Sequence, residues 1–178
     1  MTEAFTISAP TIDDAAELSA VAQASFREAF VAQSYPPEDL AHFLDTAMGM
    51  GRFAAQLADP DYSISVARGD DGAIIGYVKM GPNHLPMPQG EPDPALSREL
   101  HQLYLLPAAQ GTGVAGALMA WAQDEARSHG ALAIYLSVFI ENIRAQRFYA
   151  RHGFVEIGKN PFRVGTIVDD DRVWKCTL

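Results

Sequence analysis

The chain of 178 residues is poor in cysteine and in basic side chains. Its single cysteine, Cys176, cannot form an intramolecular disulfide, and no cysteine and histidine cluster has the spacing of metal ligands. Lys and Arg number 13 against 22 Asp and Glu, for a formal net charge of −9. Because neutralising phosphates requires concentrated basic residues, we expect no nucleic-acid partner, and we also expect no metal.

The sequence also lacks a long apolar run. No stretch reaches the roughly 18 apolar residues of a membrane span, although 48% of the residues are hydrophobic. Residues 1–10 have neither the basic region nor the apolar core of a signal peptide. We therefore expect one cytoplasmic domain over residues 1–178, without membrane association. The excess of acidic over basic residues favours solubility and is compatible with a small cationic substrate.

The most informative stretch is residues 99–116, ELHQLYLLPAAQGTGVAG. Its first part alternates like a strand, which Pro107 ends because proline has no N–H to donate. Gly111 and Gly113 permit backbone conformations that a Cβ forbids, and they let a ligand approach the backbone closely. A helix begins at about Gly113, and its unpaired first amides favour an anion. The stretch therefore predicts a phosphate site.

Three phosphate-binding motifs compete for this turn, beside the alternative of a helix start that glycine merely makes flexible. GTGVAG at residues 111–116 matches the dinucleotide fingerprint, but PAAQ separates it from its strand. A P-loop is excluded because no Lys-Ser/Thr follows the glycines. Gln-x-x-Gly-x-Ala at residues 110–115 resembles the acyl-CoA pyrophosphate loop of the GCN5-related N-acetyltransferase superfamily, with Ala115 where glycine is commonest.

Periodicity predicts the elements on both sides of the turn. Before it we expect a strand at 5–9, helices at about 15–31, around 40–47 and at 52–58, and a hairpin of strands at 62–68 and 73–80. The loop at 81–94 holds five of the chain's 11 prolines and is either a substrate-side lid or a loose connection. After the turn we expect a helix to 129, a strand at 131–139, a helix from Asn142 to Gly153, and strands at 154–157 and 166–178 with an acidic turn at 169–171.

This order of elements is the topology of the same superfamily, and the resemblance covers essentially the whole chain. Its specific parts are residues 103–119 and NIRAQRFYARHGF at 142–154, which resembles the family signature Asn-x-x-Ala-x-x-x-Tyr-x-x-x-Gly-Phe. The resemblance implies an α/β fold with a mixed, mostly antiparallel twisted sheet of about seven strands. Helices would cover both faces, and a central parallel strand pair would splay around the cofactor.

The resemblance further implies acetyl-CoA as co-substrate. Its pyrophosphate would be held by the loop that Gln110 opens, through the amides of Gly111, Thr112, Gly113, Val114, Ala115 and Gly116. The pantetheine arm would pair with the strand edge at Leu103, Tyr104 and Leu105, and the Leu105 amide would donate to the thioester carbonyl. Asn142 would reach the pantetheine, a role compatible with its being a helix N-cap.

Two residues are expected to carry the chemistry. Tyr149 matches the family's general acid for the departing CoA thiolate; the alternative is core packing with Phe148. Glu99 lies eleven residues before Gln110, where some family members have their general base. An amine with a pKa of about 10.4 is neutral in roughly one molecule in 2,500 at pH 7, so a base or a water relay is needed. Alternatively, Glu99 is a strand-end carboxylate in a solvated rim.

The N-terminal part resembles the branch that contains bacterial spermidine/spermine acetyltransferases. Tyr35, Glu38 and Asp39 would then lie near the acceptor, although the two carboxylates also suit an ordinary first helical turn. We expect direct acetyl transfer, in a ternary complex, to a small cationic amine such as a polyamine, by a monomer or homodimer. The alternatives are a peptide, amino-acid or aminoglycoside acceptor, a non-catalytic acyl-CoA-binding or regulatory protein and, more distantly, a dinucleotide-dependent oxidoreductase.

Overall fold

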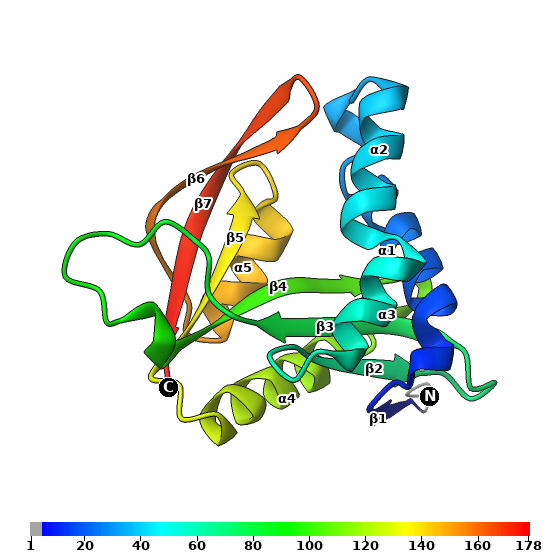
Figure 1. Cartoon of the computed structure of the whole chain (residues 1–178), viewed down its shortest axis with the longest axis horizontal. Helices are drawn as coiled ribbons and strands as arrows, with labels where there is room; N and C mark the ends of the chain where they lie inside the picture. The colour runs from blue at the N-terminus through cyan, green and yellow to red at the C-terminus, as the bar shows by residue number, and fades with distance from the viewer. Residues whose placement is uncertain (1–4) are drawn as a thin grey trace.

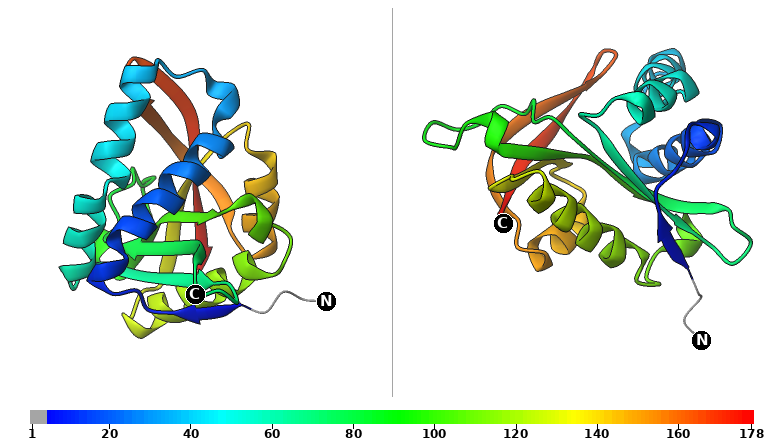
Figure 2. Two further views of the ribbon diagram at one scale, coloured as in Figure 1. Left: turned by 90° about the vertical axis from the view of Figure 1, so that its right-hand side faces the viewer. Right: turned by 60° about the horizontal axis from the view of Figure 1, so that its bottom comes forward.

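The structure is a computed structural model that describes residues 5–178. These residues form a seven-stranded sheet in the order β1-β2-β3-β4-β5-β7-β6, with helices on both faces (Figures 1 and 2). Within the described residues β4 and β5 pair in parallel, and every other neighbouring pair is antiparallel. The expected fold class is therefore confirmed.

The first half of the chain follows the expected order closely. Its elements are β1 Thr6–Ser8, α1 Ala15–Ala29, α2 Pro37–Met48, α3 Met50–Ala58, β2 Ser63–Arg68 and β3 Ile74–Gly81. Short 3₁₀ turns at Ile12–Asp14 and Val31–Gln33 flank α1. The backbone N–H of Thr11 donates to the Asp14 carboxylate over 2.7 Å, which is the capping arrangement that the sequence pattern suggests.

The second half comprises β4 Ser97–Leu105, α4 Val114–Ser128, β5 Ala133–Phe139, α5 Ile143–Arg151, β6 Val155–Val164 and β7 Ile167–Thr177, with 3₁₀ turns at Pro94–Leu96 and Pro107–Ala109. Two expectations were wrong here. The strand expected at 154–157 continues through Pro161 to Val164, because β6 lies at the sheet edge, where a missing N–H is tolerated. Residues 169–171 are no turn: they lie inside β7, with Asp169 and Asp171 buried and Asp170 exposed.

The sheet opens between β4 and β5. Their parallel pairing, in the described part of the chain, covers Ser97–Glu99 against Ala133–Tyr135, and beyond it the two strands diverge (Figure 1). β4 also has a bulge, because Lys79 pairs with Gln102 and Met80 pairs with Leu100. The expected splay of the central parallel pair is thus present, and it separates the sheet into two arms.

The helices divide between the two faces of the sheet. α1, α2 and α3 cover one face with a core that includes Leu18, Phe26 and Phe53, all essentially inaccessible to solvent. α4 and α5 cover the other face with a core that includes Leu118 and Phe154. No helix within residues 5–178 is long and apolar enough to cross a membrane.

Candidate active site

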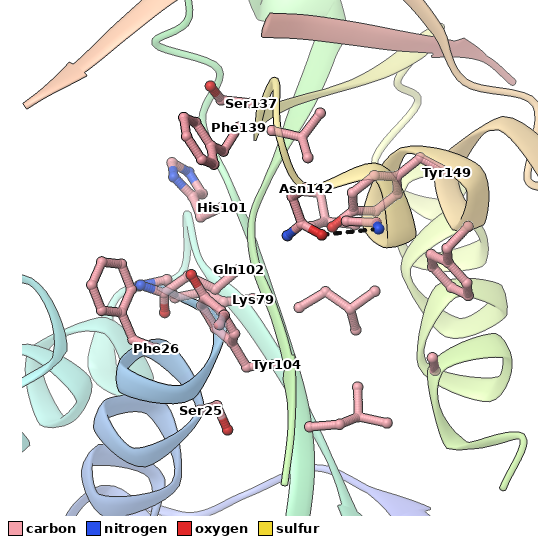
Figure 3. A pocket seen from close by; sticks show the side chains of 18 of the residues that line it. Ser25, Phe26, Lys79, His101, Gln102, Tyr104, Ser137, Phe139, Asn142 and Tyr149 are labelled. Carbon is pink, nitrogen blue, oxygen red and sulfur yellow. Dashed lines mark hydrogen bonds between the residues drawn. The ribbon is translucent and has the colours of Figure 1, made fainter. Parts of the chain in front are cut away.

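A cavity of about 1160 Å³ occupies the opening between the two arms of the sheet. Figure 3 shows that β4 runs between two groups of lining residues: Asn142 and Tyr149 lie on the α5 side, and Phe26, Lys79, Gln102 and Tyr104 lie on the α1 side. The cavity is therefore open to both faces of the sheet where β4 and β5 diverge.

The glycine-rich turn lies at the α4 end of this cavity. Gly111 and Gly113 have φ angles of +81° and +96°, which residues with a Cβ rarely adopt. A Cβ placed at either glycine or at Gly116 would meet no atom within 4 Å, so the space in front of this backbone is open. The first amides of α4 have no intrahelical acceptors, and no side chain caps them. The turn thus fits the pyrophosphate of acetyl-CoA.

The predicted loop residues divide into two groups. Gln110, Gly111, Gly113, Ala115 and Gly116 line the cavity. Thr112 and Val114 do not: the Thr112 hydroxyl donates to the carbonyl of Ala109 over 2.7 Å, and the Val114 side chain is fully buried beneath the loop. These two residues hold the shape of the loop.

Two arginines of α5 add positive charge near this end of the cavity. Arg144 donates to the side-chain carbonyl of Gln110, and both Arg144 and Arg151 line the cavity. Both lie within residues 142–154, at positions where the family signature specifies no residue type. Their position suits the phosphate groups of a nucleotide, which arginine binds through several N–H donors.

The β4 edge presents backbone donors to the opening. The amide of Leu106 donates to the carbonyl of Ile75 on β3 over 2.9 Å. Because backbone direction alternates along a strand, the amides of Leu105 and Leu103 point to the opposite edge, toward the opening. This orientation is the one that pairing with an extended pantetheine chain requires.

Asn142 and Tyr149 both line the cavity from α5. The side-chain oxygen of Asn142 accepts from the amide of Ala145 over 3.1 Å, so Asn142 is the expected N-cap (Figure 3). The ring of Tyr149 packs at 5.6 Å from that of Phe148, and burial raises its pKa well above the usual value of 10. Tyr149 lines the cavity with 8% of its surface exposed. Because its pKa is raised, its hydroxyl remains protonated at neutral pH.

Glu99 is buried instead of lying in a solvated rim, with 9% of its surface exposed. One carboxylate oxygen accepts from the amide of His84 over 2.9 Å, and the other lies 3.1 Å from Nδ1 of His101. The second ring nitrogen of His101 lies 3.1 Å from the carbonyl of Pro82. Glu99 and His101 thus form a connected pair that lines the cavity on the α1 side.

The segment around residues 81–94 is anchored at several points. Leu85 and Met87 pack against the buried cluster of Ala133, Tyr135 and Val173, and the Glu91 carboxylate accepts from the Tyr135 hydroxyl and from Lys175. His84 and Leu85 line the cavity. The segment is therefore part of the cavity wall, and the description as a loose connection was wrong.

Lys79 is a buried cation that sequence reasoning missed. Its ammonium donates to the side-chain carbonyl of Gln56 over 3.1 Å and lies 5.3 Å from the centroid of Phe53. Burial, with a smaller contribution from Arg52, lowers the pKa of Lys79 to about 7, and Glu99 opposes this shift. The one sequence signal was a lysine within an otherwise apolar strand.

Asp171 of β7 is a buried carboxyl group that also lines the cavity, and sequence reasoning missed it as well. Ser137 donates to its Oδ2 over 3.1 Å, and Asn160 donates to the Ser137 hydroxyl over 3.0 Å. Burial raises the pKa of Asp171 to about 6, and Asp169 adds to this shift. The run of three aspartates resembled a turn, whereas strand alternation through β7 would have placed its first and third members on one face.

Tyr35, Glu38 and Asp39 do not line this cavity. Tyr35 is buried, and its hydroxyl donates to the carboxylate of Asp169. Glu38 is exposed. Asp39 accepts from the backbone and side chain of Thr166, over 3.1 and 3.3 Å, and so connects α2 to the β6–β7 turn. Their contact with an acceptor stays a prediction.

Within residues 5–178, no group of three or more His, Cys, Asp and Glu side chains is arranged to hold a metal ion. Cys176, the single cysteine, is buried and has a free thiol.

Comparison with known proteins agrees with this geometry. Residues 22–154 match the model of the acetyltransferase (GNAT) family. The chain therefore belongs to this family, as an acetyl-CoA-dependent N-acetyltransferase. It is 41% identical over 160 residues to an uncharacterized N-acetyltransferase of Mycobacterium tuberculosis, with 90% of this chain and 95% of the relative covered.

Two further proteins are similar to this chain, one in sequence and one in fold. The chain is 32% identical over 117 residues to the aminoalkylphosphonate N-acetyltransferase of Salmonella typhimurium, covering 66% of this chain and 72% of the relative. The PaiA N-acetyltransferase of Thermoplasma acidophilum, solved in complex with coenzyme A, has a similar fold with a TM-score of 0.79. That pair shares 19% identity over 98% of this chain and 99% of the other.

Proposed function

We propose that the protein transfers the acetyl group of acetyl-CoA directly to the primary amine of a small cationic acceptor, within a ternary complex. The observation that carries this proposal is the cavity itself, which is continuous through the opening between β4 and β5. It has the glycine-rich turn before α4, which we assign to the phosphates, on one side and buried polar side chains on the other. The two substrates would therefore approach the same point of β4 from opposite faces.

On the cofactor side, the backbone amides from Gly111 to Gly116 would bind the pyrophosphate, assisted by Arg144. The amides of Leu103 and Leu105 would pair with the pantetheine, and the free amide group of Asn142 would contact it. Acetyl-CoA supplies an activated acyl group. A donor at Leu105 would stabilise the negative charge that develops on the thioester oxygen.

Two side chains would move protons. Glu99, directly or through His101 and water, would remove the proton that the acceptor amine must lose. Tyr149 would donate its proton to the departing thiolate. Because burial raises the tyrosine pKa, the proton transfer would accompany cleavage of the carbon–sulfur bond instead of preceding it.

For the acceptor we propose a polyamine-like amine first. The net charge of −9 and the buried carboxylates of Glu99 and Asp171 support a cationic molecule. The test is a screen of polyamines, amino acids, aminoglycosides and peptide N-termini, measured by CoA release. Good turnover of aminoglycosides or peptides without turnover of polyamines would contradict this choice.

An amine that carries an acidic group is the second candidate, because Lys79 presents a buried ammonium to the same side of the cavity. The similarity to an aminoalkylphosphonate N-acetyltransferase supports this class. A Lys79→Met variant separates the two candidates. It should raise KM for aminomethylphosphonate by about tenfold if the acidic group binds Lys79, and leave KM for spermidine unchanged or lower.

A non-catalytic acyl-CoA-binding protein is the alternative from another class. Separate calorimetric titrations with acetyl-CoA and with NADH test the cofactor, and CoA release tests turnover. Binding of acetyl-CoA without turnover of any amine would support the binding protein. Binding of NADH without binding of acetyl-CoA would contradict both the acetyltransferase and the acyl-CoA-binding protein.

A further inference from the structure

One carboxylate oxygen of the cavity wall is left without a partner. Asp171 lines the cavity with 8% of its surface exposed. Its Oδ2 accepts from Ser137, but its Oδ1 is buried and has no hydrogen-bond partner within residues 5–178. No Lys, Arg or His of the described chain forms an ion pair with it, and neighbouring Asp170 pairs with Arg172 over 2.8 Å. A buried carboxylate in this state is costly unless a donor reaches it.

The surroundings of Asp171 hold it in place. Asn160 donates to Ser137, which donates to Asp171, so two neighbouring strands fix the side chain. Phe139 lies directly opposite Asp171 in the β5–β7 ladder, and the Phe30 ring is 6.1 Å from the Phe139 ring. All of these residues line the cavity. An oriented carboxylate beside aromatic rings is a combination that suits an ammonium group.

Asp171 also lies close to Tyr104. Burial is the main cause of the raised pKa of Tyr104, and the charge of Asp171 adds to it. Tyr104 belongs to the part of β4 beyond its pairing with β5, and Figure 3 shows it on the α1 side of β4. A group bound at Asp171 is therefore near Tyr104, on the side of β4 that we assign to the acceptor.

Resting on the proposed function, we propose that Asp171 binds the ammonium group of the acceptor, with Phe30 and Phe139 beside it. This contact narrows the class of acceptors to primary amines that enter the cavity as cations. It completes the hydrogen bonding of Oδ1 only when the acceptor is present. It also favours the charged amine on entry and leaves the proton for Glu99 to remove.

The test is calorimetric binding of spermidine, phenethylamine and aminomethylphosphonate to the protein saturated with CoA. Asp171→Asn keeps the shape and the bond from Ser137 but removes the charge. Whichever amine binds the wild type should bind the variant about 10- to 100-fold more weakly, with unchanged affinity for CoA. Asp170→Asn is the matched control, because it removes one charge from the exposed face of the same strand and should leave amine binding unchanged.

A pH profile separates binding from a merely structural role. Phenethylamine stays cationic between pH 5 and pH 7, so a change in its affinity over this range reports on the protein. With the pKa of Asp171 at about 6, affinity should fall about tenfold from pH 7 to pH 5 in the wild type, and stay level in Asp171→Asn. Asp169 and Asp170 neighbour this group, and Tyr35 and Tyr104 face it; the two tyrosines stay neutral because their pKa values are raised.

Equal amine affinity of the wild type and Asp171→Asn would overturn the inference, and so would a wild type that binds none of the three amines. If Asp171→Asn does not fold, Ser137→Ala replaces it, because it frees the carboxylate and should weaken amine binding several-fold. Amine binding that depends on Asp171, without CoA release from acetyl-CoA, would leave this inference standing and contradict the proposed function.

Discussion

The two sides of the cavity are assembled differently. On the cofactor side, the proposed residues come from two short segments, 103–116 and 142–149, and most of the contacts proposed for acetyl-CoA use the backbone. On the acceptor side, the lining side chains come from α1, β3, β5, β6 and β7, far apart in the sequence. A phosphate cradle needs one local conformation, which a short motif encodes, whereas acceptor recognition needs side chains that only the folded sheet brings together.

The two sides also differ in their charged groups. Near the cofactor turn, the charges are Arg144 and Arg151 of α5, both of them exposed. On the acceptor side, burial moves the pKa of Lys79 down to about 7 and that of Asp171 up to about 6. Groups with pKa values near neutrality respond to a bound amine or acid, so the acceptor side is where pH should have its effect.

The largest expected effect on activity is that of removing the hydroxyl of Tyr149, and Tyr104 on the other side of β4 provides the matched comparison. Tyr149→Phe should lower kcat by roughly 10- to 1,000-fold and leave acetyl-CoA affinity nearly intact, because the hydroxyl acts on the leaving thiolate in the transition state. Tyr104→Phe removes the hydroxyl of a half-buried tyrosine on the acceptor side and should change kcat less than about threefold. Steady-state kinetics measures kcat of both variants and the wild type, and thermal unfolding controls for correct folding. A fully active Tyr149→Phe would mean that the phenol only packs.

Glu99→Gln should lower kcat/KM by about 10- to 100-fold at pH 7, because the acceptor amine then loses its base. The loss should shrink as pH rises, since more acceptor arrives neutral. Rates measured from pH 6 to pH 10 test this expectation. A loss that is constant over the whole range, with a lowered Tm, would show that the carboxylate only anchors His84 and His101.

Asp171→Asn should raise the stability of the free protein by up to about 3 kcal/mol above pH 7. The folded-state pKa, about 6, lies above the ordinary value of 3.8, so ionising this carboxyl destabilises the folded protein. Its favourable contribution is complete below about pH 4 and is lost as pH rises through 6. The difference between wild type and variant should therefore appear between pH 4 and pH 7 in urea unfolding. If Asp171→Asn were less stable than the wild type at pH 8, this prediction would be wrong.

The smallest effect is expected in the turn. Gly113→Ala should cost about 1 kcal/mol in stability or in acetyl-CoA binding, because its φ of +96° strains a residue with a Cβ. Space is not the cause, since nothing lies within 4 Å of the new methyl group. Gly51→Ala is the matched control: it lies in α3, has equal space, and should stabilise by roughly 0.5–1 kcal/mol. Tm and calorimetric acetyl-CoA affinity measure both variants.

Local patterns predicted most of the fold. The alternation at 62–80, the glycine turn and the capped helix at Asn142 depend on neighbours within a few residues, and each formed where it was expected. The errors occurred where a local pattern pointed one way and the sheet the other. The strand expected at 154–157 was too short, and residues 169–171 resembled a turn, but pairing between β6 and β7 extends the first strand to Val164 and places the three aspartates within the second.

The sequence by itself determined the order of the elements, the glycine-rich turn before α4 and the positions of Asn142 and Tyr149, because backbone conformation and helix periodicity are encoded over short distances. Only the tertiary structure decided that Glu99 is buried beside His101, that Lys79 loses its solvent, and that Asp171 faces the cavity while Asp39 holds the β6–β7 turn. Burial and charge neighbours are properties of the assembled arms, and no segment of the chain contains them alone.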